Sequence, residues 1–477
     1  MKKLLLIAFI ISFAFVLKAQ DKSAKNYDEA FNLIAAWLET QKDFDRLPGI
    51  SAIVVEDQKI LWEGAFGYAN LEKKVESKPN TIYSICSISK LFTSVAIMKL
   101  YDEGKLRLDD KIEDLLPQYK LQQAFPESGP ITIRTLMTHS SGLPREANFP
   151  YWTNPDFQFP SKEQVDKGLE KQKTLYPAST YFQYSNLALT LLGEIVEEVS
   201  GKPYSDYIKE NILTPLQLND TRTFMPENLY GTKLSIGYSA LNRNGAREKV
   251  TFFDANGIKP AAGFSSTVED LAKFAMWQFR LRDTNKVEIL KPSTLKYMQQ
   301  VHWTNPNWNI TWGLGFSVVK GYNGNTWVGH GGSCPGYRTV LKLDLNTKRA
   351  YSVMVNAGGS KPANYVKGMD QILSKVETVD SLSKNNQVNF NDYTGYYSLQ
   401  TWWSEIYFTK WNGKLAALVL PTENPGDALK FYKHIEGDTF RRIRDNDELG
   451  EELVFERDEN GNVFRYKTHN NYNSKIK

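Results

Sequence analysis

Apolar side chains recur at helical spacing near the start of the chain and then alternate with polar ones. Residues 27–44 have the period of an amphipathic helix. Residues 49–56 and 59–68 are two strand-like runs separated by a short polar turn, which predicts a β-hairpin. A second helix is predicted over 87–103, because its body is apolar and Gly104 follows as a C-terminal cap.

The middle of the chain alternates helical stretches with loops rich in Pro, Asn, Ser and aromatic residues. Strand-like runs return afterwards and precede another helix; the runs are 313–320, 326–329, 337–343 and 350–356, and the helix is 364–376. A sheet with strands from both ends of one domain explains this order. We therefore expect an α+β fold over residues 22–378, with a mainly antiparallel sheet flanked by helices and a helical insertion at about 110–290.

The last part of the chain has a different pattern. Residues 379–390 are polar and without periodicity, which predicts a linker. Residues 391–477 contain short alternating segments, and turn pairs such as Asn412-Gly413 separate several of them. The segments are 393–397, 405–409, 415–420, 451–457 and 463–467. We expect a small all-β, barrel-like domain here.

The first residues are typical of an export signal. Two lysines precede an apolar run at 4–17, which is shorter than the roughly 20 residues that span a bilayer, and Ala19 offers a cleavage site. The chain has 58 Lys and Arg against 54 Asp and Glu, and removing residues 1–19 takes away three lysines and no acid. The net charge then falls from +4 to +1. We expect a secreted or periplasmic protein with no nucleic-acid partner and no stable membrane insertion after cleavage.

Several familiar motifs are absent from the sequence. It contains neither a G-x-x-x-x-G-K-[ST] phosphate loop nor an H-E-x-x-H zinc motif. The glycine-rich run at 329–336 does not match the dinucleotide fingerprint, because Cys334 occupies its last glycine position. The five histidines lack close metal-ligand spacing, and two cysteines are too few for a thiolate zinc site. We therefore expect no metal and no cofactor.

A serine and a lysine three residues apart are the first candidates for catalysis. The S-x-x-K spacing occurs five times, but only Ser87 opens a helix that is apolar all round. Lys90 shares a helix face with Ser87, and burial of its amine would lower its pKa enough for it to act as a base. The alternative is a capping serine followed by a lysine that extends to solvent. This segment alone leaves both interpretations open.

Two further segments carry polar groups suited to catalysis. Tyr184 and Asn186 precede a predicted helix at 187–199. A phenol beside an ammonium can ionise more easily and relay protons, and a carboxamide can hold a lysine. The Y-x-N spacing by itself is a weak indication of catalysis.

The late segment consists of His330, Gly331, Gly332 and Ser333. Two strand glycines suggest that something approaches the backbone closely, such as a substrate, although a glycine-rich bend with a surface histidine is the alternative.

The order of these three motifs resembles that of the serine β-lactamase and penicillin-binding-protein-like family, in its class C (Tyr-x-Asn) branch. Segments 131–144, 260–274 and 329–339 also resemble that branch, and the likeness covers roughly residues 28–378. The branch includes D,D-peptidases, D-aminopeptidases and esterases. The small β domain resembles a lipocalin-like appendage found on some relatives.

The resemblance implies a role for each motif. Ser87 matches the nucleophile that is acylated, and Lys90 and Tyr184 match the proton-transfer pair. The substrate-binding set comprises Asn186, His330, Gly331, Gly332 and Ser333, with Asn186 as the orienting amide and the Ser333 N–H paired with that of Ser87 as the oxyanion hole. The likeness also brings Cys86 and Cys334 near the same cleft, which leaves open whether they form a disulfide. His139, in the segment THSSGLP, is expected to order a loop.

The sequence departs from the β-lactamase pattern at His330. β-Lactamases usually carry a lysine there, whereas histidine has a reference pKa of about 6.5 and is mostly neutral at pH 7. This favours an esterase, amidase or peptidase that acts on a small-molecule or peptide substrate through a Ser87 acyl-enzyme. A β-lactamase proper and a non-catalytic β-lactam or peptidoglycan-binding protein are the alternatives. The sequence leaves the oligomeric state open.

Overall fold

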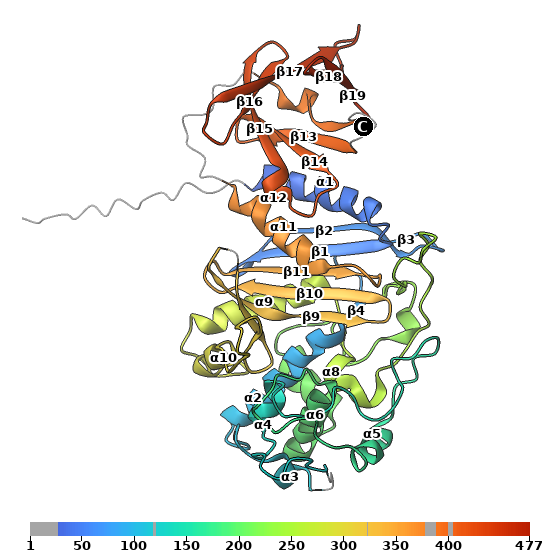
Figure 1. Ribbon diagram of the computed structural model, residues 1–477, viewed down its shortest axis with the longest axis vertical. Helices are drawn as coiled ribbons and strands as arrows, with labels where there is room; N and C mark the ends of the chain where they lie inside the picture. Colours follow the sequence, from blue (N-terminus) through green and yellow to red (C-terminus); the bar gives the residue numbers. More distant parts are fainter. Residues whose placement is uncertain (1–26, 118–120, 322, 377–387, 399–403) are drawn as a thin grey trace, which may run out of the picture.

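The computed structural model describes residues 27–117, 121–321, 323–376, 388–398 and 404–477 (Figure 1). The predicted signal peptide, residues 1–19, lies outside these ranges, as does the predicted linker up to residue 387. Within the described ranges, no helix has both the length and the apolar character needed to cross a membrane.

A nine-stranded sheet forms the centre of the larger part of the molecule. Its strands follow the order β3-β2-β1-β11-β10-β9-β8-β7-β6, and each neighbouring pair is antiparallel. The strands are β1 (Gly49–Glu56), β2 (Lys59–Asn70), β3 (Val75–Glu76), β6 (Trp303–Thr304), β7 (Thr311–Trp312), β8 (Ser317–Lys320), β9 (Thr326–Cys334), β10 (Tyr337–Asp344) and β11 (Arg349–Val355). Because β1 pairs with β11, the predicted antiparallel sheet built from both ends of one domain is confirmed.

Helices cover both faces of this sheet. Along β1, Ile50, Ala52 and Val54 pack in one hydrophobic core with α1 (Asp28–Phe44) and α11 (Pro362–Ser374). The alternate residues of β1 belong to a second core on the opposite face. Successive side chains of a strand point to opposite faces, so a strand covered on both sides is buried along its length, as β1 is from Gly49 to Val55.

The second core belongs to a helical layer that surrounds α2 (Ser89–Asp102). The other helices of the layer are α3 (Ile112–Leu115), α4 (Ile133–Met137), α5 (Lys162–Leu169), α6 (Asn186–Ser200), α7 (Tyr204–Ile208), α8 (Lys259–Ala262), α9 (Val268–Arg282) and α10 (Pro292–Met298). Short helical turns η1 (Cys86–Ile88), η2 (Lys209–Leu213), η3 (Glu227–Leu229) and η4 (Asn256–Ile258) and a strand pair β4 (Tyr83–Ser84) and β5 (Ser265–Ser266) connect them.

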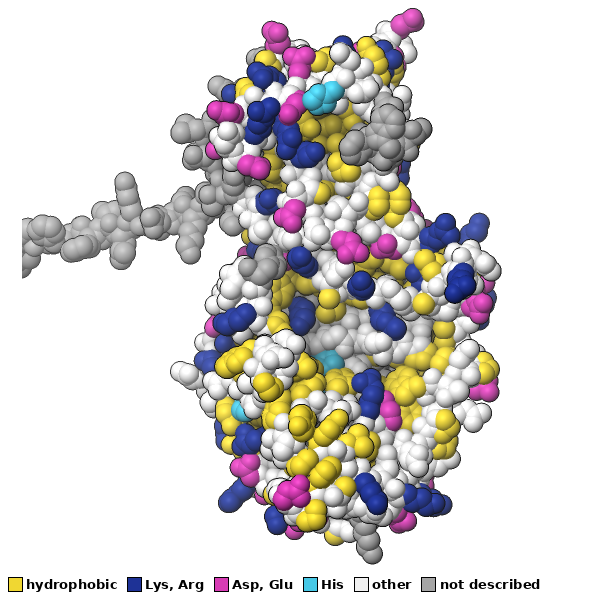
Figure 2. All heavy atoms as spheres, viewed as in Figure 1, with side chains coloured by type: hydrophobic (Ala, Val, Ile, Leu, Met, Phe, Trp, Pro, Cys, Tyr) yellow, Lys and Arg dark blue, Asp and Glu magenta, His cyan; other side chains and the backbone are white. Residues whose placement is uncertain are grey.

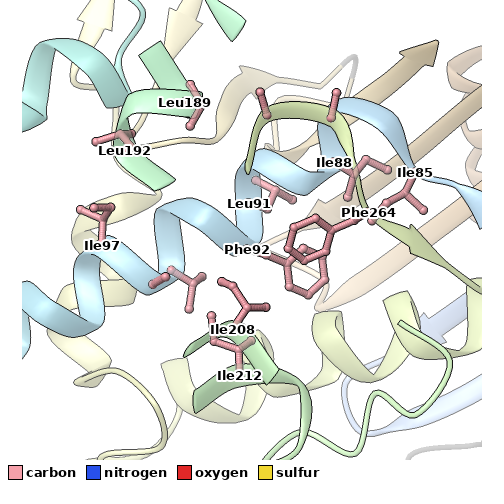
Figure 3. Packing of buried hydrophobic residues seen from close by; sticks show 14 of the residues in the cluster. Ile85, Ile88, Leu91, Phe92, Ile97, Leu189, Leu192, Ile208, Ile212 and Phe264 are labelled. Carbon is pink, nitrogen blue, oxygen red and sulfur yellow. The ribbon is translucent and has the colours of Figure 1, made fainter. Parts of the chain in front are cut away.

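The helix α2 is buried almost along its whole length. Phe92 stacks on Phe264 and Phe274, with ring centroids 5.1 and 4.5 Å apart. Figure 3 shows Leu91 and Ile97 of the same helix directed into the surrounding cluster. The predicted helix over 87–103 thus exists, but its first turn is the separate element η1, which contains Ser87.

The C-terminal residues form an eight-stranded antiparallel sheet that nearly closes into a barrel. The strands, in order from one edge to the other, are β12 (Gly395–Ser398), β13 (Glu405–Trp411), β14 (Lys414–Leu420), β15 (Leu429–Glu436), β16 (Thr439–Ile443), β17 (Leu449–Arg457), β18 (Val463–Thr468) and β19 (Asn471–Ser474). The edges meet where the backbone N–H of Tyr396 donates to the carbonyl of Lys477 over 2.8 Å. The module also contains η5 (Phe390–Asp392) and α12 (Pro425–Ala428).

Sequence pattern predicted five of these strands and missed β15, β16 and β19. The predicted turn at Asn412-Gly413 is confirmed, because both residues have the positive φ that a tight hairpin turn requires. The sequence of β15 lacks the apolar alternation typical of a strand, because polar residues occupy its inward side. Lys430 and His434 lie there on either side of Tyr432.

The outer face of the barrel packs on the α1 and α11 layer. Trp411, Ala416 and Leu418 share the core of these helices, and the Trp37 indole N–H donates to the carbonyl of Thr422 over 2.9 Å. The module therefore lies on the side of the central sheet opposite α2, as Figure 1 shows.

Candidate functional site

Ser87 lies where the start of α2 meets the edge of the central sheet. Strand β8 pairs with β9 only as far as Gly329, so residues 330–334 of β9 have a free edge beside η1. Cys86 and Cys334 form a disulfide across this junction, with their Cα atoms 5.7 Å apart. The disulfide that the sequence left open is thus present, and it joins the residue before Ser87 to the strand that carries Ser333.

The Lys90 amine is buried and directed at Ser87. Its Nζ lies 3.2 Å from Ser87 Oγ, 2.7 Å from Asn186 Oδ1 and 2.8 Å from the carbonyl oxygen of Ala261. Only 1% of the lysine is exposed. Burial holds the pKa of Lys90 well below its usual value; Glu146 opposes this shift and Arg145 adds to it. The predicted proximity of Ser87 and Lys90 is therefore present, and the amine does not reach solvent.

Asn186 links Lys90 to a carboxylate that the sequence did not indicate. Its Oδ1 accepts from Lys90, and its Nδ2 donates to Glu146 Oε1 over 2.7 Å. Glu146 also accepts from the indole N–H of Trp152 over 2.8 Å and from the hydroxyl of Tyr151. These bonds fix the orientation of the Asn186 amide, so that its oxygen faces Lys90. No motif marks Glu146, because it acts through contacts with residues distant in sequence.

The ring centroid of Tyr184 lies 4.9 Å from Lys90 Nζ. Burial raises the pKa of Tyr184, and the nearby Ser87 side chain only partly offsets this shift. The sequence-based expectation of an easily ionised phenol is therefore wrong for the free protein, in which the phenol is protonated and the amine is the stronger candidate base. His139 Nδ1 accepts from the backbone N–H of Ser185 over 3.2 Å, so it holds the loop before α6, as expected.

His330 lies close to Tyr184 and Trp312, with ring centroids 6.1 and 5.5 Å away. Burial, reinforced by the charge of Lys90, lowers the pKa of His330 to about 3. The His330 side chain is therefore neutral at pH 7, with a smaller protonated fraction than the reference pKa of histidine predicts. The cationic residues that line the cleft are instead Arg145, Lys249 and Arg338.

The two glycines of β9 differ in their surroundings. A Cβ at Gly332 would clash with the backbone oxygen of Ile85, whereas the nearest atom to a Cβ at Gly331 is the Thr339 oxygen at 3.7 Å. The close approach that the sequence suggested therefore occurs at Gly332, and the approaching group is the chain segment before Ser87 rather than a substrate. A Cβ at Gly331 would make only an ordinary van der Waals contact.

Ser87, Asn186 and Ser333 line a cleft of about 750 Å³. Its described lining residues all lie between positions 87 and 359, so the described part of the C-terminal module contributes none. Figure 2 shows a hollow on this face of the molecule, with Lys, Arg and Asp or Glu side chains around it. Of the predicted site residues, Ser87, Asn186 and Ser333 line the cleft. Lys90 contacts Ser87 and lies over the ring of Tyr184, and neither Lys90 nor Tyr184 is among the lining residues.

A helix-covered antiparallel sheet, with Ser87 beside the buried amine of Lys90 at its edge, is the arrangement of the β-lactamase fold. A model of the beta-lactamase family matches residues 34–370, which is more than half of the chain. The chain belongs to the beta-lactamase family.

Related proteins agree with this assignment. Protein flp of Staphylococcus aureus (strain MW2) is 28% identical over 317 residues, which cover 65% of this chain and 59% of flp. Penicillin-binding protein 4* of Bacillus subtilis (strain 168) is 29% identical over 325 residues, covering 64% of this chain and 67% of that protein. The chain thus spans less than two thirds of the length of flp.

Solved structures are similar over the same fold. An octameric penicillin-binding protein homologue from Pyrococcus abyssi has a TM-score of 0.65 and 26% identity, and the match covers 93% of this chain and 99% of that one. A D-stereospecific amidohydrolase from Streptomyces sp. has a TM-score of 0.59 and 23% identity, covering 72% of this chain and 98% of that one, which is a likeness of fold.

Substitution of the two β9 glycines tests the contact between β9 and η1. We expect Gly332→Ala to destabilise the protein by about 1–3 kcal/mol, because its methyl group has no space beside Ile85. The matched variant Gly331→Ala should change stability by less than about 0.5 kcal/mol. Denaturant unfolding of both variants measures the difference, and equal stabilities would contradict the assigned contact.

Proposed function

We propose that the protein is an exported serine hydrolase that cleaves an ester or amide, including peptides with a D-residue, through an acyl-enzyme on Ser87. The observation that carries this proposal is the buried Lys90 amine, 3.2 Å from Ser87 Oγ. A desolvated amine with a lowered pKa gives up its own proton more readily than an ordinary lysine and can then accept the serine proton.

Acylation begins when neutral Lys90 takes the hydroxyl proton and Ser87 Oγ attacks the substrate carbonyl carbon. The N–H groups of Ser87 and Ser333 stabilise the negative charge that develops on the carbonyl oxygen. As the bond to the leaving group breaks, the proton passes from Lys90 to the leaving oxygen or nitrogen, with the Tyr184 hydroxyl as the relay. The products of this step are the released alcohol or amine and the Ser87 ester.

Deacylation uses water as the second nucleophile. Lys90 accepts one proton from the water, with the Tyr184 hydroxyl as the relay, as the water oxygen attacks the acyl carbonyl carbon. That proton passes to Ser87 Oγ when the bond between Oγ and the acyl carbon breaks and the acid product leaves. Asn186 keeps the amine in position throughout, since it accepts from Lys90 and is itself fixed by Glu146. No cofactor or metal takes part in these steps.

The neutral side chain of His330 is the argument against a β-lactamase proper. Without a cation at this position, the strand edge lacks the charge that would attract a β-lactam carboxylate beside Ser87. The names of similar proteins, a D-stereospecific amidohydrolase and a D-amino acid amidase, support amide substrates. The class C branch remains part of the proposal, as does a lipocalin-like origin of the C-terminal module.

Two other functions use the same nucleophile. A β-lactamase would hydrolyse nitrocefin rapidly, and absence of turnover at high protein concentration would exclude it. A non-catalytic β-lactam or peptidoglycan-binding protein would acylate once and show a burst without steady-state release. The ordered Lys90–Asn186–Glu146 network supports turnover over simple binding.

Export is proposed from the N-terminal sequence, and the Cys86–Cys334 disulfide supports it. Disulfides persist mainly in oxidising compartments such as the periplasm and the extracellular space.

Covalent labelling tests the nucleophile. We expect a fluorophosphonate or penicillin-like probe to attach to Ser87 and the Ser87→Ala variant to lose labelling, with ester hydrolysis reduced by about 10³-fold or more. Peptide mass spectrometry of the labelled protein identifies the site. Labelling at another serine would overturn the assignment.

The pH dependence of acylation tests the base. The rate should rise as pH increases through the pKa of Lys90 and level off well below the usual range of a lysine, because the uncharged amine is the active form. Glu146 raises this pKa and Arg145 lowers it, so Glu146→Gln should move the acidic limb to lower pH and Arg145→Gln to higher pH.

Single-turnover acylation rates of these two variants, measured across pH, separate the two shifts. The Arg338→Gln variant, which removes another cleft cation, is the control and should leave the limb where it is. Shifts of the same sign in the Glu146 and Arg145 variants would show that Lys90 is not the titrating base.

A further inference from the structure

The C-terminal barrel encloses a hollow of about 470 Å³ that is separate from the Ser87 cleft. Apart from His469 in the turn between β18 and β19, its lining residues come from alternate positions of strands β13 to β19, which are the positions that face the barrel interior. On β15, for example, Lys430 and Tyr432 line the hollow, whereas Phe431 between them packs outward against the α1 and α11 core. No described residue lines both this hollow and the cleft.

The barrel interior contains both packed aromatic side chains and charged ones. The packed aromatic side chains include Phe390, Tyr393, Phe440 and Phe455, none of which lines the hollow. Charged side chains occupy inward positions around the hollow. Inward positions of a small barrel are normally filled by apolar side chains or line a ligand site. Charged residues at such positions therefore need a partner or a ligand.

The charges around the hollow are not matched. Lys430 and Arg442 are the cationic lining residues, and Glu451 is the acidic one. Arg442 Nη1 lies 3.8 Å from Glu451 Oε2, which is too long for a hydrogen bond, and Glu451 is shared with Arg444 at 3.3 Å. Among the described residues, Arg442 Nε has no hydrogen-bond partner and Lys430 makes no ion pair. Positive charge is thus in excess.

The floor of the hollow is apolar. Phe408, Leu453 and Tyr466 line it and also belong to the buried core of the barrel. On the face shown in Figure 2, hydrophobic side chains lie recessed in this module between Lys and Arg side chains. The hollow therefore offers an apolar surface below and a positive charge at the rim.

We propose that this hollow binds a small organic anion with an apolar body, such as a medium-chain carboxylate, with Arg442 and Lys430 holding the anionic head. Arginine suits this role because its planar guanidinium can donate two hydrogen bonds to one carboxylate. The apolar body packs on Phe408, Leu453 and Tyr466. The site depends on no feature of the Ser87 cleft.

Titration calorimetry of the full-length protein with decanoate tests this site. We expect one decanoate to bind per chain, and decanol and decylamine, which have the same apolar body, to bind at least about tenfold more weakly because they lack the negative charge. The Arg442→Gln and Lys430→Gln variants should each weaken decanoate binding by about tenfold, and the double variant should weaken it further.

The matched control is Lys433→Gln, which removes an exposed, outward-facing lysine from the same strand and should leave decanoate affinity unchanged. Thermal unfolding of each variant verifies that the module is folded. Saturation of the Ser87 cleft with a fluorophosphonate should also leave decanoate binding unchanged. Because the titration measures binding and not hydrolysis, it tests the barrel site even if the protein has no hydrolase activity.

Three results would overturn the proposal. They are equal affinities for decanoate and decylamine, unchanged decanoate binding in the folded Arg442 and Lys430 variants, and absence of decanoate binding to the unlabelled protein at millimolar concentration. Loss of decanoate binding after labelling of Ser87 would assign the ligand to the cleft instead and also exclude the barrel site.

Discussion

The burial of one amine is the constraint around which the candidate site is built. Lys90 Nζ contacts three oxygen atoms, from Ser87, Asn186 and Ala261, and is almost wholly removed from water. A protonated amine at this position would lack the hydration that stabilises its charge, so the neutral form is favoured. The same burial keeps the Tyr184 phenol protonated and His330 neutral, since each would have to carry its charge away from solvent.

The surrounding fold makes this burial possible and rigid. The aromatic stack of Phe92, Phe264 and Phe274 fixes α2 in the middle of the helical layer, and Ser87 lies in the turn just before that helix. On the opposite side, Gly332 allows β9 to approach the segment before Ser87, and the Cys86–Cys334 disulfide joins the two covalently. Helix, turn and strand edge therefore hold their positions relative to one another.

The central sheet separates two chemical environments. The Ser87 cleft lies on the side of α2, and its lining includes the cationic Arg145, Lys249 and Arg338. The C-terminal barrel lies beyond α1 and α11 on the other side and has its own hollow with an excess of positive charge. The described lining of the cleft comes from residues 87–359, and none of it comes from the described part of the barrel.

Local sequence pattern determined much of this structure. The hairpin of β1 and β2, the helices α6 and α9, and the strands β10 and β11 follow from periodicity that neighbouring residues establish by themselves. The three-residue spacing of Ser87 and Lys90 likewise fixed that their side chains share one side of a helical turn. Family resemblance then associated them with Tyr184 and Asn186.

Contacts between distant segments decided the rest. Glu146 has no motif, because its role depends on Asn186, Tyr151 and Trp152 meeting it in space. His330 is neutral because it is buried, and burial cannot be read from the residue type. The sequence pattern did not predict β15 as a strand, because its inward positions are polar. The sequence by itself determined which groups lie on which local element, since spacing along a helix or strand is a local property. Only the tertiary structure decided which groups lose water and which meet, because both depend on the packing of segments far apart in the chain.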